Sequence, residues 1–430
     1  MNILVVNGYV RQNKGDAALM SVLCQELQKT FPHAAISISS QENPKHYPTF
    51  EDWKNVGSFN QYCFDPAKGK FGHLLRLLLC GGVITAMSTI PKVMHNKNMW
   101  FLPRALRLQL SALTQADLVV SMGGGYLNGD ASLMAQVCVY LMLAPLKLAK
   151  RFGACTVCAP QSMGPFATTL QKKMVISVLE NIDLVLTREQ KTVKLLADLS
   201  RRFPVVPSVD SGFLFHTDKT VSLRDQLHVD ANTLLVGITV RRWLDANRQR
   251  AYEQAVAKTV DHLVTKYKAT VVFIPQVTSF LGGDDDRLTA KNVYANIVHK
   301  KQVFLLEQQY THQHIKALYS DLDVIIGTRF HSVIFSLTSH VPALAIEYEH
   351  KTSGIMHDLA LDDWVVKIED ASPQVLMRKV DALIVNKKQY AQQLKDRLPA
   401  YIAKAQDATT IIKNVYEAAF NPPPEQHNQS

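Results

Sequence analysis

Four segments of the chain place hydrogen-bonding or titratable side chains where a predicted strand ends and a predicted helix begins. The most informative of them starts at Gly327 and reads GTRFHS, with Arg329 and His331 two residues apart in the turn. An arginine fixes an anion, and a histidine that titrates near neutrality can transfer a proton. A lone histidine is more often structural, but this one lies beside an arginine at a strand end. We therefore interpret the turn as a catalytic or substrate-binding site.

A second predicted strand, Ala343–Ile346, follows soon after this turn and continues the same chemistry. Four polar side chains come after it: Glu347, Tyr348, His350 and Lys351. Arg241 follows an earlier strand of the same half. Carboxyl ends of parallel strands meet at one edge of a sheet, where ligands of open α/β sheets bind. The expected substrate site at this edge is formed by Arg241, Arg329, Glu347 and Lys351.

The first half of the chain has two glycine-containing turns of the same kind. The predicted strand Ile3–Asn7 leads through NKGDAAL into a helix, and Asp16 is a good N-cap there and a candidate catalytic base. An ordinary capped glycine turn explains this segment equally well. The predicted strand Leu118–Met122 is followed by three glycines that let the backbone approach a ligand closely: Gly123, Gly124 and Gly125.

The last of the four segments carries polar side chains after two successive predicted strands. Gln161 and Ser162 follow Cys155–Ala159 and are uncharged hydrogen-bonding groups suited to sugar or phosphate oxygens. Arg188 follows Leu184–Thr187, and its planar fork can pair with a carboxylate or a phosphate. A solvent-facing salt bridge is the alternative for Arg188. We include all three among the predicted substrate-binding residues.

The sequence indicates no metal site. The run GGDDD at Gly282–Asp286 holds three adjacent carboxylates, which we expect to be solvated in a glycine turn. Cys155 and Cys158 have the CxxC spacing, but they fall on a predicted strand, where residues three apart face opposite sides. His312 and His314 lie two apart on a predicted helix and face different ways. We read all six cysteines as reduced and mostly buried, in a cytosolic protein.

The order of the predicted strands and helices indicates the fold that positions these segments. Strands and helices alternate through both halves, a pattern typical of parallel α/β sheets. We predict an α/β fold with two Rossmann-like domains facing a cleft, over residues 1–215 and 216–385. A C-terminal helix over residues 386–420 follows them. The tail, residues 421–430, is expected to be disordered.

Composition and charge restrict the partners. The 430-residue chain has a formal net charge of +10 and a pI near 9.2, which favours nucleic acid, a membrane surface or a phosphorylated substrate. The basic residues are dispersed and form no run interleaved with aromatics, so we exclude nucleic acid. We expect no secretory signal, because the chain opens directly on a strand pattern.

The most apolar window of the chain, Leu74–Ile90, allows two interpretations. It is shorter than the roughly 20 residues needed to span a bilayer. A buried or partly exposed helix is one interpretation. The other is a peripheral membrane contact that lies in the plane of the bilayer and uses nearby basic side chains, namely Lys68, Lys70, Arg76 and Lys92.

Taken in their order along the chain, the four segments resemble the polysaccharide pyruvyl transferase family over roughly residues 2–360. The resemblance is carried by NKGDAAL, SMGGGY, QSMGPF, TRE, the aspartate of VDSGF, GTRFHS and P-x-x-x-I-x-Y-x-x-K-x-x-G. The block YEHKTSGIM is similar to the colanic-acid branch of the family. Ala159 and Phe330 depart from the family pattern, which often has glycine and leucine there, but neither change removes a charged group.

This resemblance implies a GT-B-like architecture, with residues 1–215 on the acceptor side and residues 216–385 on the donor side. It also implies transfer of pyruvate from phosphoenolpyruvate to a sugar of an exopolysaccharide, or of its lipid-linked precursor, as a cyclic ketal. No metal or other cofactor is required. Arg329, with a second arginine or Lys351, then binds the donor anion, and His331 protonates its methylene carbon. The base for the sugar hydroxyls is Asp16 or the same His331.

Two other functions fit part of the pattern. A nucleotide-sugar glycosyltransferase of the same architecture is the main alternative, because Arg329 and Lys351 also suit a diphosphate. A membrane-docked scaffold in a polysaccharide assembly complex is the non-enzymatic alternative, based on the apolar window. We expect the protein in the cytoplasm or at the inner face of the cell membrane.

Overall fold

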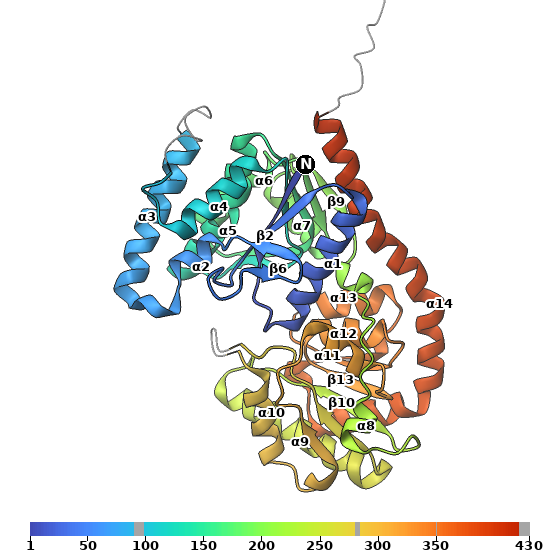
Figure 1. Ribbon diagram of the computed structural model, residues 1–430. Helices are drawn as coiled ribbons and strands as arrows, with labels where there is room; N and C mark the ends of the chain where they lie inside the picture. Colours follow the sequence, from blue (N-terminus) through green and yellow to red (C-terminus); the bar gives the residue numbers. More distant parts are fainter. Residues whose placement is uncertain (90–98, 280–283, 350, 421–430) are drawn as a thin grey trace, which may run out of the picture. The chain divides into compact units, whose positions relative to one another are not determined.

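The computed structural model describes residues 1–89, 99–279, 284–349 and 351–420. The chain divides into two compact units (Figure 1). Unit 1 holds Met1–Val10, Leu19–Ser211 and the chain from Lys404 onward, and unit 2 holds Arg11–Ala18 and Gly212–Ala403. The division thus falls at residues 211/212, and the short segment Arg11–Ala18 belongs to the second unit. The predictions for Lys92, Gly282, His350 and the tail lie outside the described residues.

Unit 1 is built on a mostly parallel sheet with the strand order β3-β4-β2-β1-β5-β7-β8-β9, and β6 pairs with β7. The strands are β1 Asn2–Gly8, β2 Ala35–Ser40, β3 Thr49–Phe50, β4 Trp53–Asn55, β5 Leu118–Ser121, β6 Gly124–Gly129, β7 Cys155–Phe166, β8 Leu184–Thr187 and β9 Val205–Pro207. Only β3 and β4 pair in antiparallel orientation among these strands. Strand β5 is buried along its whole length, as expected for an inner strand covered on both faces.

The helices of unit 1 cover this sheet. They are α2 Phe59–Cys63, α3 Gly69–Thr89, α4 Arg104–Gln115, α5 Leu133–Phe152, α6 Thr169–Leu179 and α7 Gln190–Leu199, with the 3-10 turn η1 Pro66–Lys68 between α2 and α3. The 3-10 turn η3 Ser211–Leu214 follows β9 and continues into unit 2. Helices α1 Lys14–Thr30 and α14 Pro373–Phe420 contribute residues to both units. Ser132 caps α5, and a capping box of Thr168 and Gln171 begins α6.

Unit 2 is built on a fully parallel sheet with the strand order β12-β11-β10-β13-β14-β15. Its strands are β10 Leu235–Thr239, β11 Thr270–Phe273, β12 Val303–Leu305, β13 Val324–Gly327, β14 Ala343–Glu347 and β15 Val365–Lys367. Its helices are α8 Leu223–Leu227, α9 Ala246–Tyr267, α10 Asp286–Ala295, α11 His312–Tyr319, α12 Phe330–Leu337 and α13 Lys351–Asp358, with 3-10 turns η5 Lys300–Gln302, η6 Asp362–Trp364 and η7 Ile368–Asp370. Strands β10, β11, β13 and β14 are entirely buried.

Three sequence predictions need correction at the level of elements. Gly124, Gly125 and the segment after Ala159 do not lie in loops, because they belong to β6 and to the second half of β7. The predicted C-terminal helix over residues 386–420 is part of one 48-residue helix, α14, which starts at Pro373, since no glycine or further proline lies between Pro373 and residue 386. Helix α3 has 21 residues, so the apolar segment is longer than the predicted window.

By length and composition alone, Phe59–Thr89 and α5 are both apolar enough to cross a membrane. Helix α5 is a core helix of unit 1, and nearly half of its most apolar window is buried. The window in Phe59–Thr89 is only 17% buried. Figure 1 shows α3 at the periphery of unit 1. The apolar side chains of α3 are therefore a surface feature rather than part of the core.

Candidate active site

Three neighbouring strands of unit 2 are each followed by a cation. Arg241 follows β10, Arg329 follows β13 and Lys351 follows β14, and these strands are adjacent in the sheet. Strand β10 pairs with β11 on one side and with β13 on the other, so the strand order reverses there. Ligands of open α/β sheets bind outside the carboxyl ends of the strands at such a switch point. The parallel sheet therefore brings three predicted substrate-binding residues to one edge.

Arg329 lies between two carboxylates and is only 7% exposed. Its Nε and Nη2 donate to Asp286 Oδ1 at 3.0 and 2.5 Å, and its Nη1 and Nη2 donate to the two oxygens of Asp284 at 3.1 and 2.5 Å. Arg241 Nη2 lies 3.9 Å from Asp284 Oδ2. The charge on Arg329 is therefore already compensated by this protein's own acids, which the sequence alone did not reveal.

The two carboxylates are not equivalent. Asp286 is 2% exposed and also accepts hydrogen bonds from the backbone N–H groups of Gln276 and Val277, both at 2.9 Å, so it orients Arg329 from inside the fold. The Asp284 side chain is 37% exposed. Burial by itself raises the pKa of the Asp284 carboxyl. The hydrogen bonds and the positive charge of Arg329 lower this pKa by more than burial raises it, so it lies below the ordinary value. Asp284 is the accessible, ionised partner of the pair.

The prediction that the carboxylates of GGDDD are solvated is wrong for two of them. Asp285 is 4% exposed, caps α10 by accepting from the N–H of Arg287, and pairs with the Arg287 guanidinium at 2.7 Å. Asp286 begins the same helix. Asp285 is bound by the N–H and guanidinium of Arg287 at the helix start, and Asp286 by Arg329 and by two backbone N–H groups after β11, because the run ends at a helix rather than in an open turn.

Arg241 is held by aromatic rings. Its Cζ atom lies 4.0 Å from the ring centroid of Tyr348 and 4.6 Å from that of Trp243. Lys351 Nζ lies 5.7 Å from the Tyr348 ring and 2.7 Å from Glu349 Oε2. Cation–π contacts of this kind fix the position of a cation without neutralising it. The Tyr348 ring thus contacts two cations, Arg241 and Lys351, which follow different strands.

His331 lies in the first turn of α12 and is partly buried. A β-carbon on Gly15 would lie 2.1 Å from His331 Nδ1 and 2.5 Å from its Cγ. No side chain fits there, so glycine at this position is required by the approach of the imidazole. Gly15 belongs to the Arg11–Ala18 segment of unit 2. The glycine turn in the first half of the sequence and the GTRFHS turn therefore meet within one unit.

Asp16 is not the N-cap of α1, which corrects the sequence prediction. The helix begins at Lys14, and Asn13 Oδ1 accepts from the Asp16 N–H at 3.4 Å while Asn13 Nδ2 donates to Asp16 Oδ2 at 2.5 Å. This reciprocal pair resembles a capping box, with Asn13 as the cap and Asp16 at the third helical position. Asp16 directly follows Gly15, and its role as a catalytic base stays a prediction.

The start of α1 is tied to the segment after β11. The Lys14 N–H donates to the Gln276 carbonyl at 2.9 Å, and the Thr278 N–H donates to the Gln12 carbonyl at 3.0 Å. The N–H of the same Gln276 donates to Asp286. One short segment therefore positions both the glycine that contacts His331 and the carboxylate that orients the site arginine.

Glu347 has a structural partner. It is 8% exposed, and its Oε1 accepts from the Ser353 N–H at 3.1 Å and from the Ser353 hydroxyl at 2.5 Å. These bonds satisfy the first turn of α13 and hold it at the end of β14. Its assignment to substrate binding stays a prediction.

The predicted site residues of unit 1 lie at a different sheet edge, and the packing explains several of them. Gly123 is a glycine because a β-carbon would lie 2.5 Å from the Pro160 carbonyl oxygen, and Gly124 has a φ of +133°. Gly125 continues into β6. Gln161 is fully buried within β7. Close strand packing, rather than an open loop, accounts for the glycine run.

Arg188 forms a buried ion pair with Asp210, and its Nε donates to Ser162 Oγ at 2.8 Å. Arg188 is 4% exposed and Asp210 is 1% exposed. The alternative of a solvent-facing salt bridge is therefore wrong. The ion pair links two positions that carry the family resemblance, and the role of Arg188 and Ser162 in substrate binding stays a prediction.

Sequence reasoning missed Asp284, Asp286 and Asn13. The signal for the aspartates was an acidic run immediately before a predicted helix, in the same half of the chain as the site arginine. The signal for Asn13 was a second good capping residue three positions before Asp16. Among the residues that the structure describes, no group of three or more His, Cys, Asp or Glu side chains could hold a metal ion.

Comparison with known proteins agrees with this architecture. The family model described as polysaccharide pyruvyl transferase matches residues 13–350. The chain is 23% identical over 445 residues to the amylovoran biosynthesis protein AmsJ of Erwinia amylovora. This alignment covers 96% of this chain and 97% of that protein.

Two-domain sugar enzymes have the same fold. A putative UDP-N-acetylglucosamine 2-epimerase from Listeria monocytogenes superposes with a TM-score of 0.61 at 11% identity, covering 98% of this chain and 97% of its own. A sucrose-phosphate synthase from Thermosynechococcus elongatus gives a TM-score of 0.60 at 11% identity, covering 97% and 100%. The predicted GT-B-like fold of two Rossmann-like domains is confirmed by these likenesses.

Proposed function

Because the chain belongs to the polysaccharide pyruvyl transferase family, as the sequence predicted, we propose that this transferase uses phosphoenolpyruvate to form a cyclic pyruvate ketal on a saccharide. The acceptor is a sugar of an exopolysaccharide or of its lipid-linked precursor. The observation that carries the proposal is the convergence of Arg241, Arg329 and Lys351 at adjacent strand ends, with His331 in the turn that follows Arg329. No cofactor enters the scheme.

The donor carries a carboxylate and a phosphate, so it needs more than one fixed cation. Arg329 is oriented by the buried Asp286 and also pairs with the accessible Asp284. A donor oxyanion can replace the Asp284 carboxylate as the partner of Arg329. The Arg329 guanidinium is already oriented for it, because Asp286 stays in position. Arg241 and Lys351 then meet the second anionic group.

The reaction adds one proton to the donor and removes one from each of two sugar hydroxyls. His331 donates its proton to the methylene carbon, which becomes the methyl group, while the first hydroxyl oxygen bonds to the adjacent carbon. The second hydroxyl oxygen then displaces phosphate from that carbon and closes the ketal. Asp16 and His331 are the two candidates for the base that takes the hydroxyl protons, and Gly15, which precedes Asp16, lies against the His331 ring. The products are the ketal and inorganic phosphate.

The decisive experiment measures phosphate release from phosphoenolpyruvate with the purified full-length chain and candidate acceptor saccharides. We expect phosphate release that depends on both substrates. The alternative, a nucleotide-sugar glycosyltransferase, predicts turnover with a UDP-sugar and no phosphate release from phosphoenolpyruvate. That second outcome would exclude the proposed donor.

The role of His331 has its own test. We expect His331→Ala to lower kcat by about 10²–10⁴, the usual range for a general acid–base group. His299 lies exposed in unit 2, away from the site, so His299→Ala is the matched control and should leave kcat unchanged. A His331→Ala variant within threefold of the wild-type rate rules out the proton-transfer role.

A peripheral membrane contact through α3 completes the proposal. Five large apolar side chains lie on one face of this helix at spacings of three and four residues and are 40–81% exposed: Phe71, Leu74, Leu75, Leu78 and Leu79. Residues 66–116 contain seven Lys or Arg and no Asp or Glu. An apolar face with a strong excess of basic over acidic neighbours in the sequence suits the surface of an anionic bilayer and disfavours a second copy of the same basic surface. Such a contact places the enzyme at the cytoplasmic face, where a lipid-linked acceptor would be presented.

Arg76, predicted to take part in this contact, instead pairs with Asp65 at 3.2 Å. The test is co-sedimentation with vesicles of phosphatidylglycerol and phosphatidylethanolamine. We expect the double variant Leu75→Glu, Leu78→Glu to stay in the supernatant while keeping wild-type turnover of a soluble acceptor. Leu170→Glu, at a leucine of α6 that is 55% exposed, is the matched control. Sedimentation of the double variant at the wild-type level would contradict the contact.

A further inference from the structure

One aromatic ring at the edge of the unit 2 sheet has no part in the proposed chemistry. Phe330 begins α12 and is only 4% exposed. Its ring centroid lies 5.1 Å from that of His331, with the two ring planes 77° apart. Lys351 Nζ lies 5.3 Å from the same Phe330 centroid. The Phe330 ring therefore contacts both the proposed general acid and one of the cations at the strand ends.

Lys351 is held less firmly by charged groups than Arg329 is. The Arg329 guanidinium is oriented by Asp286, which is buried. Lys351 pairs with Glu349 at 2.7 Å, but the Glu349 side chain is 38% exposed. An ion pair with an exposed partner contributes little, because solvent screens it and both side chains lose conformational freedom. The Lys351 ammonium lies at the end of a flexible four-carbon stem, so it needs a further contact to stay in one place.

Two aromatic rings supply that contact. Lys351 Nζ lies 5.3 Å from the centroid of Phe330 and 5.7 Å from that of Tyr348. Both distances are within the roughly 6 Å over which a ring face attracts a cation. The Tyr348 ring also contacts Arg241, whose Cζ lies closer to it, at 4.0 Å. Phe330 therefore provides the nearer ring for Lys351, and a ring leaves the positive charge available to a ligand.

Buried hydroxyl groups hold the backbone on both sides of Phe330. Thr239 Oγ1 accepts hydrogen bonds from the N–H groups of Thr328 and Arg329 at 3.0 and 3.3 Å. Ser332 Oγ donates to the Arg329 carbonyl at 2.5 Å and lies 2.8 Å from Thr239 Oγ1. Thr239 is 1% exposed and Ser332 is fully buried. The position of the Phe330 ring is therefore set by the fold of unit 2.

From these contacts we propose that Phe330 is a positioning residue, which holds the Lys351 ammonium at the strand ends for an anionic group of the substrate. The identity of that anion rests on the proposed function, whereas the contact between the ring and the ammonium does not. An aliphatic side chain of similar size fills the same volume but does not attract the ammonium. It leaves Lys351 with the exposed Glu349 as its charged partner.

The first experiment changes the charge distribution of the ring and leaves its shape nearly unchanged. Mono-, di- and trifluorophenylalanine are introduced in place of Phe330 by amber suppression, because each fluorine withdraws electron density from the ring face. We expect the KM for phosphoenolpyruvate to rise stepwise with the number of fluorines, by about fivefold in total, with the effect on KM rather than on kcat. Phe213, a fully buried ring of unit 2 that packs against Tyr401, is the matched control. The same series at Phe213 should leave KM unchanged.

A double-mutant cycle tests whether the effect acts through Lys351. We expect Phe330→Leu to raise the KM for phosphoenolpyruvate about fivefold in the wild-type chain. In a Lys351→Met chain the same substitution should raise it less than about twofold, because the loss of one partner already removes the contact. Thermal unfolding of the four proteins checks that each of them is folded.

NMR observes the same contact without any donor. Lysines are labelled with carbon-13 at Cε, and the Lys351 signal is identified by its absence in Lys351→Arg. Protons above a ring face are shifted to lower frequency, so in Phe330→Leu the Lys351 signal should move toward that of exposed lysines. Inorganic phosphate, used as the probe anion, should bind to Phe330→Leu about fivefold more weakly than to the wild type.

These measurements separate the positioning role from the proposed function. If phosphoenolpyruvate fails as donor while the Lys351 signal and phosphate binding both respond to Phe330→Leu, the proposed function falls and the positioning role stands. The role is overturned if the fluorinated series leaves KM unchanged, if Phe330→Leu has the same effect with and without Lys351, or if the Lys351 signal does not move.

Discussion

Replacement of Gly15 by alanine isolates the contact between the start of α1 and His331. In a helix, alanine is more favourable than glycine by about 1 kcal/mol. Here, however, the new β-carbon would lie 2.1 Å from His331 Nδ1, 2.5 Å from Cγ and 2.8 Å from Cβ. Because Cβ and Cγ lie close to the backbone, a change of side-chain rotamer cannot relieve the clash cheaply.

Overpacking of this kind costs about 1–3 kcal/mol, so the net destabilisation of Gly15→Ala is roughly 0–2 kcal/mol after the helix gain. That corresponds to a fall in Tm of a few degrees at most. The effect on catalysis should be larger, since a displacement of about 1 Å can cost about 10²-fold in rate. We therefore expect kcat to fall by about 10–10² while the protein stays folded.

The assay combines thermal unfolding with phosphate release from phosphoenolpyruvate. Gly81 in α3 is the matched control, because a β-carbon there meets no atom within 4 Å. Gly81→Ala should leave kcat unchanged and should stabilise the fold by up to about 1 kcal/mol. If Gly15→Ala keeps wild-type kcat and shows a higher Tm, like the control, then the close approach of His331 does not exist in solution.

Further predictions concern the buried charges. Asp284→Asn removes the carboxylate that competes with the donor for Arg329, so the KM for phosphoenolpyruvate should fall severalfold; a higher KM would refute this competition. Asp210→Asn leaves the buried Arg188 guanidinium uncompensated and should lower the free energy of unfolding by about 3–5 kcal/mol in urea titrations, and a loss below 1 kcal/mol would contradict the buried pair. Burial lowers the pKa of Lys316 to about 7. Since the unfolded chain then binds more protons above that pH, stability should rise with pH between about 7 and 10 in the wild type. Lys316→Met should reduce this rise, measured as the difference in urea midpoint between pH 7 and pH 9, and an equal rise in both proteins would refute it.

The local pattern of the sequence determined the strand–helix alternation and therefore the fold class. Strand β13 and helix α12, with Arg329 and His331 between them, follow directly from the run DVIIGTRFHS, because an apolar run, a polar turn and a helical segment are local properties. The parallel-sheet rule also predicted that Arg241 and Lys351 come to the same edge. The order of the motifs along the chain was sufficient to identify the family.

Tertiary structure alone decided which charges meet. Arg329 and the two aspartates that bind it are more than forty residues apart in the sequence, and their pairing depends on where α10 starts relative to β13. The same holds for Gly15, whose requirement for a hydrogen side chain comes from an imidazole more than three hundred residues away. Sequence spacing carries no information on such contacts, because they depend on the packing of elements from distant parts of the chain.

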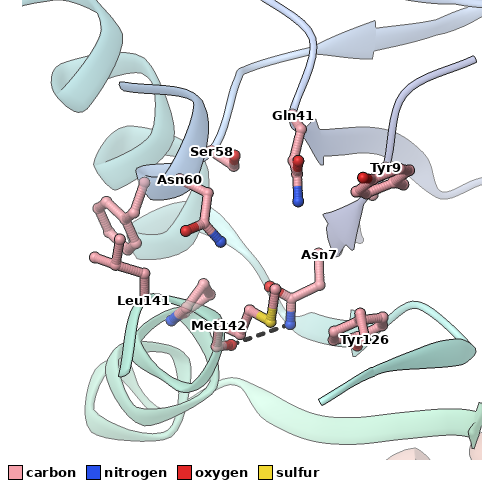
Figure 2. Close-up of a pocket in the computed structure, with 11 residues that line it drawn as sticks. Asn7, Tyr9, Gln41, Ser58, Asn60, Tyr126, Leu141 and Met142 are labelled. Carbon is pink, nitrogen blue, oxygen red and sulfur yellow. Dashed lines mark hydrogen bonds between the residues drawn. The ribbon is translucent and has the colours of Figure 1, made fainter. Parts of the chain in front are cut away.

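A small hollow in unit 1, lined by Asn7, Gln41 and Asn60 among others, shows the same division (Figure 2). Each of Asn7, Gln41 and Asn60 is an ordinary polar residue in the sequence, and the last two fall in the segment without a clear pattern. The reversal of strand order at β1 brings them together, and strand order is set by long-range pairing rather than by local propensity. The sequence by itself therefore determined the elements and the residue types. The tertiary structure decided which of those residues share a site and which compensate one another.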